Sequence, residues 1–239
     1  VINGIFAQQL IAPEAITVSM IAVGTGNDWC RMYGIPSEYE KAVQTIKNHR
    51  AIKQDIGKVH YFKKEKEQVR YFANVAGIGF DAMVAKKTNS IKEKWKRASV
   101  LLYFYSLIVS LIKYKWVRAD ITIDGEKRNE SIFSLSIGIG KYNGGGMKQL
   151  PKAVADDGLF DITLIRKISK FDVLRYAPRL YDGSFIKHSS VLLHRGKNIS
   201  VKSDKPVLLE TDGESLGCPP FSFSILPKKL TIIVGEKYE

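Results

Sequence analysis

Cysteine is scarce in this sequence, and so are patterns that would hold a metal ion through histidine. Only two of the 239 residues are cysteines, Cys30 and Cys218, and they lie far apart in unlike contexts. A disulfide framework is therefore excluded, and two reduced thiols are typical of a cytosolic protein. The four histidines share no metal-ligand spacing. They are His49, His60, His188 and His194.

Long hydrophobic runs are also lacking. The first residues, VINGIFAQQL, have neither the cationic start nor the sustained apolar core of a secretory signal. The longest nearly uncharged run, Ala98 to Ile112, has 15 residues, too few for a helix that spans a bilayer. Basic residues flank this run. We expect a buried helix here, and a helix lying on a membrane surface is the alternative.

Acidic residues are outnumbered by basic ones, 24 to 37, which gives a net charge of +13. Such an excess favours anionic partners, namely nucleotides, nucleic acids or acidic membranes. The cations are spread along the whole chain and no nucleic-acid-binding module is recognisable, so we expect no nucleic acid partner. Walker A and G-x-G-x-x-G motifs are absent as well.

The patterns that are present indicate a small α/β segment followed by a larger β-rich one, with a boundary near residue 50. Before that boundary we expect a buried strand at 16–23, a short helix starting near Asn27 and a helix at 37–49 with a capping box. Beyond it, strand signals predominate, and Asp124-Gly125 predicts a hairpin turn. Further helices are predicted at 81–90, 91–114 and 169–181.

Three glycine-rich segments stand where the chain changes direction. GTGND, from Gly24 to Asp28, lets backbone amides approach a phosphate, although a plain strand-to-helix turn explains it equally well. Asp28 is unfavourable beside a phosphate unless a cation or several donors neutralise it. GIGFDA, at 77–82, suits close packing of a strand on a helix. NGGGM, at 143–147, suits either a loop under a ligand or a tight crossing of strands.

Two kinds of carboxylate-bearing segment suggest chemistry. In AVADDGLFDI, Asp156 and Asp157 precede a glycine, a pattern found in Mg²⁺-binding loops and in solvated turns. The triplet Asp-Gly-Glu occurs twice, at 124–126 and 212–214. The first copy fits a solvated hairpin tip. The second lies among apolar residues, where partial desolvation would raise a carboxylate pKa toward values suited to a general base.

In their order and spacing, these motifs resemble the diacylglycerol kinase catalytic family in its bacterial, soluble lipid-kinase form, a group related to sphingosine kinases and NAD kinases. The matching segments are VINGI, GTGNDWCR, NVAGIGFDAMV, YNGGGMKQLPKAVADDGLFDITLI and TDGE. The resemblance implies that residues 1–50 are the remnant of a Rossmann-like nucleotide-binding α/β domain. It also implies a larger β-sandwich-like domain with inserted helices at 51–239, whose last segment packs back on the first domain.

The resemblance also implies the roles of individual residues. For ATP it implies a phosphate contact from Thr25, in a turn formed together with Gly24, Gly26, Asn27 and Asp28. For Mg²⁺ it implies the side chain of Asp157 with the carbonyl groups of Val154 and Leu159. For catalysis it implies Glu214 as the proton acceptor with Asp212 beside it, and so selects the second Asp-Gly-Glu copy.

One family motif is missing from this sequence. In relatives, the phosphate loop GGDGT stands just upstream of a segment like VINGI. We therefore expect that the part carrying it is omitted here, that the present chain is not competent by itself, and that a sheet edge is exposed where that part belongs.

The activity implied is ATP- and Mg²⁺-dependent phosphorylation of a hydroxyl group on a diacylglycerol-like lipid. One alternative is a kinase of a soluble alcohol, as in NAD kinases, and another is a lipid- or nucleotide-binding module without catalysis. The implied setting is the cytoplasm, with peripheral attachment to an anionic membrane surface. A homodimer is a further expectation, because bacterial relatives often pair.

Overall fold

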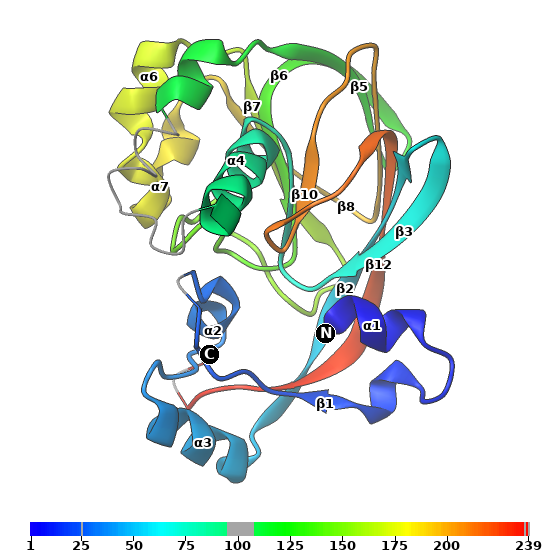
Figure 1. Ribbon diagram of the computed structural model, residues 1–239, viewed down its shortest axis with the longest axis vertical. Coiled ribbons are helices and arrows are strands. Elements are labelled where there is room, and N and C mark those ends of the chain that lie inside the picture. Colours follow the sequence, from blue (N-terminus) through cyan, green and yellow to red (C-terminus); the bar gives the residue numbers. More distant parts are fainter. Residues whose placement is uncertain (25, 95–107, 237, 239) are drawn as a thin grey trace.

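A computed structural model describes residues 1–24, 26–94, 108–236 and 238 (Figure 1). Thr25 and residues 98–107 of the long apolar run lie outside the described residues. Residues 108–113, at the end of that run, are helical. Within the described ranges, no helix combines the length and the hydropathy needed to cross a bilayer.

A curled sheet of twelve strands forms most of the molecule (Figure 1). Its main path runs β11-β10-β4-β6-β5-β9-β12-β2-β3, while β1 pairs with β12, and β7 pairs with β6 and β8. The strands are β1 (Thr17–Val18), β2 (Ala51–Lys63), β3 (Lys66–Phe72), β4 (Val75–Gly79), β5 (Val117–Ile123), β6 (Glu126–Gly138), β7 (Phe160–Arg166), β8 (Val191–Gly196), β9 (Asn198–Ser203), β10 (Leu209–Thr211), β11 (Glu214–Ser215) and β12 (Cys218–Ile233).

The helices fall into two groups (Figure 1). One group lies with β1 around the ends of β2 and β12 that are drawn at the bottom. It consists of α1 (Ile2–Ala7), η1 (Pro13–Ala15), α2 (Asp28–Met32) and α3 (Tyr39–Asn48). The other group covers the curled sheet on one side. It consists of α4 (Phe80–Lys94), residues 108–113, α6 (Lys170–Tyr176), α7 (Arg179–Asp182) and η2 (Ser184–Lys187).

Local sequence signals explain most of the turns. Asp124 and Gly125 adopt φ angles of 46° and 94°, and they join β5 to β6 as predicted. Lys64 and Glu65, inside the charged segment between β2 and β3, also have positive φ. Ser169 caps α6, because its hydroxyl oxygen accepts a hydrogen bond from the amide of Asp172 at 3.0 Å.

Four predicted elements differ from those observed. The break predicted between helices at 81–90 and 91–114 is wrong, because α4 continues from Phe80 to Lys94. The strand predicted at 16–23 is reduced to Thr17–Val18, which pairs only with β12 among the described strands. The capping box predicted at Ser37 is wrong, because α3 begins after Glu38 and that residue makes no side-chain cap. The helix predicted at 169–181 is divided into α6 and α7, because Pro178 lacks the N–H group that a continuous helix needs.

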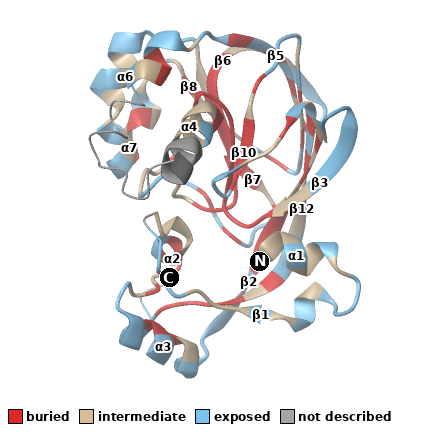
Figure 2. Ribbon diagram, viewed as in Figure 1, coloured by how far each residue is buried: buried red, intermediate tan, exposed pale blue. Residues whose placement is uncertain are grey.

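The strands β2 and β12 connect the two groups of helices. They pair along nearly their whole length, from Phe62 opposite Cys218 to Ala51 opposite Ile233. Buried residues of α2 and of both strands belong to a single hydrophobic core, whose buried members Figure 2 colours red. Beyond β12, the amide of Gly235 donates to the carbonyl of Tyr33 at 2.9 Å. The end of the chain is thus fastened to the segment that follows α2.

The contact between Gly235 and the segment that follows α2 gives a first test. A β-carbon on Gly235 would lie 1.9 Å from the carbonyl oxygen of Gly34, a backbone atom that cannot turn aside. We expect Gly235→Ala to lower the free energy of unfolding by about 1–3 kcal/mol, as overpacking does, measured by urea denaturation. Gly4→Ala is the control, since a β-carbon there meets no atom within 4 Å. Equal stability of the two variants would contradict the close packing of Gly235 against Gly34.

Candidate active site

Three turns from distant parts of the sequence come together on one side of the molecule. They are the glycine turn at 24–28, which precedes α2, the loop at 143–146, and the turn at 210–214, which joins β10 to β11. Each contains residues singled out from the sequence. Hydrogen bonds connect the first turn to the second and the second to the third.

Asp28 makes the first connection. Its carboxylate accepts hydrogen bonds from the backbone amides of Gly145 at 2.8 Å and Gly146 at 2.6 Å. It also pairs with Arg31 at 2.8 Å, and its side chain is only 12% exposed. Two amides and a guanidinium therefore neutralise Asp28, as a carboxylate in a phosphate-binding turn would require.

The second turn depends on its glycines. Gly144, Gly145 and Gly146 have φ angles of 68°, 89° and 102°, a region that side-chain-bearing residues rarely adopt. A β-carbon on Gly146 would also come within 3.2 Å of the guanidinium carbon of Arg31. The sequence left open whether these glycines serve a ligand or a tight crossing. The structure shows them at the contact between the second turn and the first.

Asn143 makes the second connection. Its side-chain amide donates to Glu210 Oε1 at 3.0 Å and to Gln149 Oε1 at 3.1 Å. The other carboxylate oxygen of Glu210, Oε2, accepts a hydrogen bond from the amide of Gly213 at 2.9 Å. The carboxylate of Glu210 therefore joins the loop at 143–146 to the turn that carries Asp212 and Glu214.

Glu210 is the functional candidate that sequence reasoning missed. It is 2% exposed, and burial raises its pKa to about 8, with the nearby carboxylates of Asp81 and Asp212 adding to the increase. It pairs across the sheet with Gly77, where a β-carbon would lie 2.9 Å from its Oε1. Gly77 of GIGFDA thus makes room for a carboxylate, which only the register of β4 and β10 reveals.

Asp212 and Glu214 have different surroundings. Asp212 has a φ of 49°, and its carboxylate accepts hydrogen bonds from the amides of Ala73, Asn74 and Val75 at 2.9, 3.0 and 3.2 Å. Glu214 is exposed. The desolvated carboxylate that we expected at this turn is therefore Glu210, whereas Glu214 is open to solvent at the end of a turn that Asp212 and Glu210 hold in place.

A second path joins α2 to the same turn. Trp29 Nε1 donates to Gln54 Oε1 at 3.2 Å, and the side-chain amide of Gln54, which is fully buried, donates to the carbonyl of Ala73. The amide of Ala73 is in turn bonded to Asp212. Asp28 and Trp29, the last two residues of GTGNDW, are therefore both connected to the turn at 210–214. The path from Trp29 runs through Gln54 on β2 and Ala73 between β3 and β4.

The loop predicted to hold Mg²⁺ pairs instead with the guanidinium group of Arg195, which lies on β8. One carboxylate oxygen of Asp157 accepts from the amide of Leu159 at 3.1 Å, and the other pairs with the guanidinium of Arg195. Arg195 also pairs with Asp161 at 3.4 Å, a contact that the register of β7 and β8 places directly across the sheet. Both oxygens of Asp157 are thus engaged by protein donors. The residues present do not fit a divalent cation bound through Asp157.

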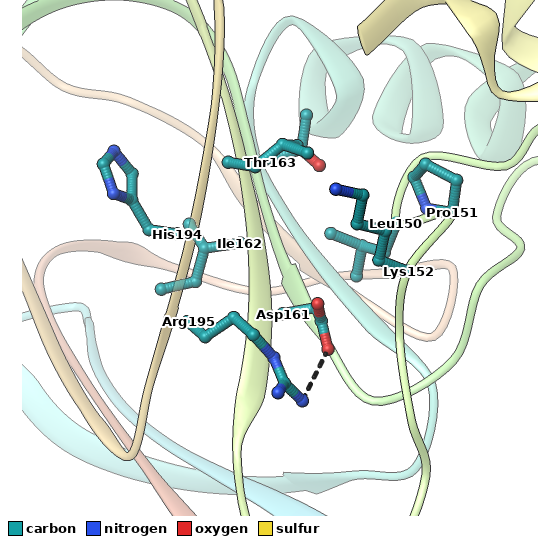
Figure 3. A pocket seen from close by; sticks show the side chains of 9 residues that line it. Leu150, Pro151, Lys152, Asp161, Ile162, Thr163, His194 and Arg195 are labelled. Atoms are coloured by element: carbon teal, nitrogen blue, oxygen red, sulfur yellow. Dashed lines mark hydrogen bonds and ion pairs between the residues drawn. The ribbon is translucent and has the colours of Figure 1, made fainter.

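A pocket of about 250 Å³ lies beside this ion pair, between β7, β8 and the segment 150–152 (Figure 3). Figure 3 shows Arg195 reaching across to Asp161 at one end of the pocket. Within the described ranges, the hydrogen bonds and ion pair of Asp157 are with Leu159 and Arg195, and not with residues of the three turns. Across the described parts of the chain, no cluster of three or more His, Cys, Asp or Glu side chains suits a metal ion.

The structure therefore brings together part of the predicted site. The described members of the glycine turn, Gly24 and Gly26 to Asp28, belong to the same connected group as Asp212 and Glu214. Thr25 lies outside the described residues. The predicted metal ligands Val154, Asp157 and Leu159 lie on the separate loop that Arg195 holds.

Two family models match the chain. The YegS C-terminal NAD kinase beta sandwich-like domain matches residues 74–234, and the diacylglycerol kinase catalytic domain matches residues 1–59. The first match covers most of the chain and contains two of the three turns. The second contains the glycine turn.

Individual relatives agree with these matches. The diacylglycerol kinase of Mycobacterium tuberculosis H37Rv is 26% identical over 95% of this chain and 72% of its own length. That of Bacillus subtilis 168 is 27% identical over 92% of this chain and 70% of its own length. A crystal structure of a diacylglycerol kinase from Bacillus anthracis Sterne has the same fold, with a TM-score of 0.65 at 19% identity, covering 93% of this chain and 68% of that one.

The raised pKa of Glu210 predicts how stability depends on pH. Between pH 4.5, its ordinary pKa, and about 8, the folded protein retains a proton that the unfolded chain has lost. Glu210 therefore makes stability fall as the pH rises through this range, by up to about 1.4 kcal/mol per pH unit. We expect Glu210→Gln to remove that slope in denaturant titrations from pH 5 to 8.5.

The control is Glu126→Gln, in the other Asp-Gly-Glu copy, whose side chain is 77% exposed. Its slope should equal that of the wild type. Parallel stability curves for Glu210→Gln and the wild type would contradict the buried, protonated state of Glu210.

The pairing of Arg195 gives another prediction. We expect thermal unfolding of the wild type to be the same in Mg²⁺ and in EDTA. Arg195→Met should lower the free energy of unfolding by about 1–3 kcal/mol, because Asp161, whose side chain is 8% exposed, loses its charged partner. Added Mg²⁺ should restore part of that loss.

Lys41→Met is the control, since Lys41 pairs with Glu38 at an exposed site, with side chains 68% and 64% exposed. It should cost less than about 1 kcal/mol. Stabilisation of the wild type by Mg²⁺ would show that the Asp157 loop accepts the ion despite Arg195.

Proposed function

The chain belongs to the bacterial diacylglycerol kinase family of lipid kinases, and we propose that it transfers the γ-phosphoryl group of ATP to a hydroxyl group of a diacylglycerol-like lipid. The observation that carries the proposal is the chain of hydrogen bonds from Asp28 through Gly145 and Asn143 to Glu210 and Gly213. It unites a turn suited to phosphate with a turn that presents an exposed carboxylate. Phosphoryl transfer requires that these two groups be held in fixed relation.

Glu214 is proposed as the general base. Its carboxylate is exposed and can meet the hydroxyl group of an acceptor. As the acceptor oxygen bonds to the γ-phosphorus, the bond from that phosphorus to the bridging oxygen breaks, ADP leaves, and the hydroxyl proton passes to Glu214. Asp212 acts as a positioning residue in this scheme, because three backbone amides occupy its carboxylate.

The glycine turn at 24–28 is proposed to receive the nucleotide phosphates. Gly24, Gly26 and Asn27 would shape it, and the family resemblance gives Thr25 the direct contact. ATP would enter as its Mg²⁺ complex, in which the metal offsets phosphate charge. We do not assign this metal to Asp157, since Arg195 occupies that carboxylate.

A lipid acceptor agrees with the net charge of +13, which favours an anionic bilayer. We propose a cytoplasmic enzyme that attaches peripherally to the membrane, and the two free thiols support a reducing compartment. A kinase of a soluble alcohol would instead turn over a water-soluble acceptor without detergent or vesicles. A binding module would bind ATP and phosphorylate neither acceptor.

The mechanism predicts the effect of removing the base. In the full-length encoded protein, Glu214→Gln should lower kcat for diacylglycerol at least about 10²-fold, because a general base contributes this much or more, while the KM for ATP stays nearly unchanged. The assay follows transfer of labelled phosphate from ATP to diacylglycerol in detergent micelles. Glu126→Gln, the same change in the solvated Asp-Gly-Glu copy, should leave kcat unaltered. Turnover by Glu214→Gln at the wild-type rate would exclude Glu214 as the base.

A further inference from the structure

Exposed apolar side chains gather on the outer side of α6 and of the helical segment 108–113. Phe171 and Leu174, three residues apart on α6, are 73% and 50% exposed. Ile108 and Ile112, four residues apart, are 43% and 63% exposed. These spacings put each pair on one side of its helix. Trp116, just beyond the second helix, is 40% exposed.

Two contacts make these residues one surface, which we call the α6 face. The ammonium group of Lys170 on α6 donates to the carbonyl of Ile112, and Lys167 lies 4.7 Å from the ring centre of Trp116. The inner sides of the same helices have their partners. Leu111, Ile168 and Val173 pack with Phe80 and Phe133 beneath the α6 face. The outer residues are therefore not needed to complete the core.

The charges around the α6 face are mainly positive. The exposed cations are Lys113, Lys115, Lys167, Lys170, Arg175 and Arg179. The acidic residues of α6 and α7 are engaged locally: Asp172 bonds to the hydroxyl of its cap Ser169, and Asp182 accepts from the amide of Ser184. Apolar side chains bordered by cations suit the interface of an anionic bilayer, which takes up the apolar groups and attracts the charges.

The α6 face is connected to the candidate site through α4. Phe80, at the start of α4, belongs to the core beneath the face and stacks on Phe133 with ring centres 4.7 Å apart. Asp81, the next residue, accepts hydrogen bonds from Ser134 and Ser136 and is close enough to Glu210 to contribute to its raised pKa. Packing and hydrogen bonds therefore connect the core beneath the α6 face, through α4, to the surroundings of Glu210; α4, α6 and α7 lie in the same group of helices (Figure 1).

We propose that the α6 face docks on an anionic lipid bilayer, with Phe171, Leu174 and Ile112 entering the interfacial region. The choice of a bilayer as the occupant rests on the proposed function, in which the acceptor is a lipid, and on the complementary charge. The α6 face is then the surface through which the enzyme binds the membrane that contains its lipid substrate.

The test is sedimentation with vesicles. The wild type should bind vesicles of equal parts phosphatidylcholine and phosphatidylglycerol, bind less at high salt, and bind weakly to phosphatidylcholine alone. The double change Phe171→Asp and Leu174→Asp should reduce the partition coefficient at least about tenfold, because it replaces both anchors with charges that the bilayer repels. Arg175→Gln with Lys113→Gln should weaken binding to the anionic vesicles only.

The matched control is Tyr39→Asp with Val43→Asp, which changes two apolar residues of α3 that are 59% and 40% exposed. Its binding should equal that of the wild type. Undiminished binding by the α6 variant, or no binding by the wild type, would overturn the proposal. The mass in solution is measured for each variant by light scattering. A dimer that the α6 double change dissociates would assign the face to self-association instead.

Kinase assays separate this proposal from the proposed function. In the full-length protein, the α6 double variant should keep its turnover on a short-chain diacylglycerol dissolved in water and lose it on vesicles. Glu214→Gln should bind vesicles like the wild type and lose turnover on both. Vesicle binding that requires the α6 face, in a protein that phosphorylates no lipid, would support docking and reject the kinase assignment.

Discussion

The backbone amides of Gly145 and Gly146 need a hydrogen-bond acceptor, and the carboxylate of Asp28, at the start of α2, provides it. The loop can present both amides because Gly145 and Gly146 have positive φ angles, which residues with a side chain rarely adopt. Donor and acceptor are 117 and 118 positions apart in the sequence. This contact therefore exists only when both parts of the chain have folded. The rest of the site follows from it, since Asn143 extends the connection to Glu210 and the turn beyond.

Glu210 gives this arrangement its electrostatic character. A carboxylate that is buried beside Asp81 and Asp212 remains largely protonated near neutral pH, so Glu210 supports the turn before Glu214 without adding its own full negative charge. Glu214 keeps its own exposure to solvent. The carboxylates of Glu210, Asp212 and Glu214 thus differ in role, because each differs in burial and hydrogen bonding.

Local signals predicted much of the fold, and the order of the motifs indicated the family. The turn predicted at Asp124-Gly125 depends on adjacent residues and formed as expected, and a helix begins after Ser169, close to the predicted start. Glu210 and Arg195 were missed because their partners lie across strand pairs whose register no local pattern encodes. A glutamate inside the apolar run VLLET, combined with the glycines of GIG, is the one signal that could have indicated a buried carboxylate.

The irregularity in β12 has a mechanical consequence. The register of β12 against β2 shifts between Leu226 and Leu230, where Lys228 has a φ of 54°. The buried carboxylate of Asp55 fixes this bend, accepting from the amides of Lys228 and Gly158 at 2.7 Å each. One buried side chain therefore holds three segments together, β2, the bulge of β12 and the turn at Gly158, at the point where the pairing of the two long strands changes register.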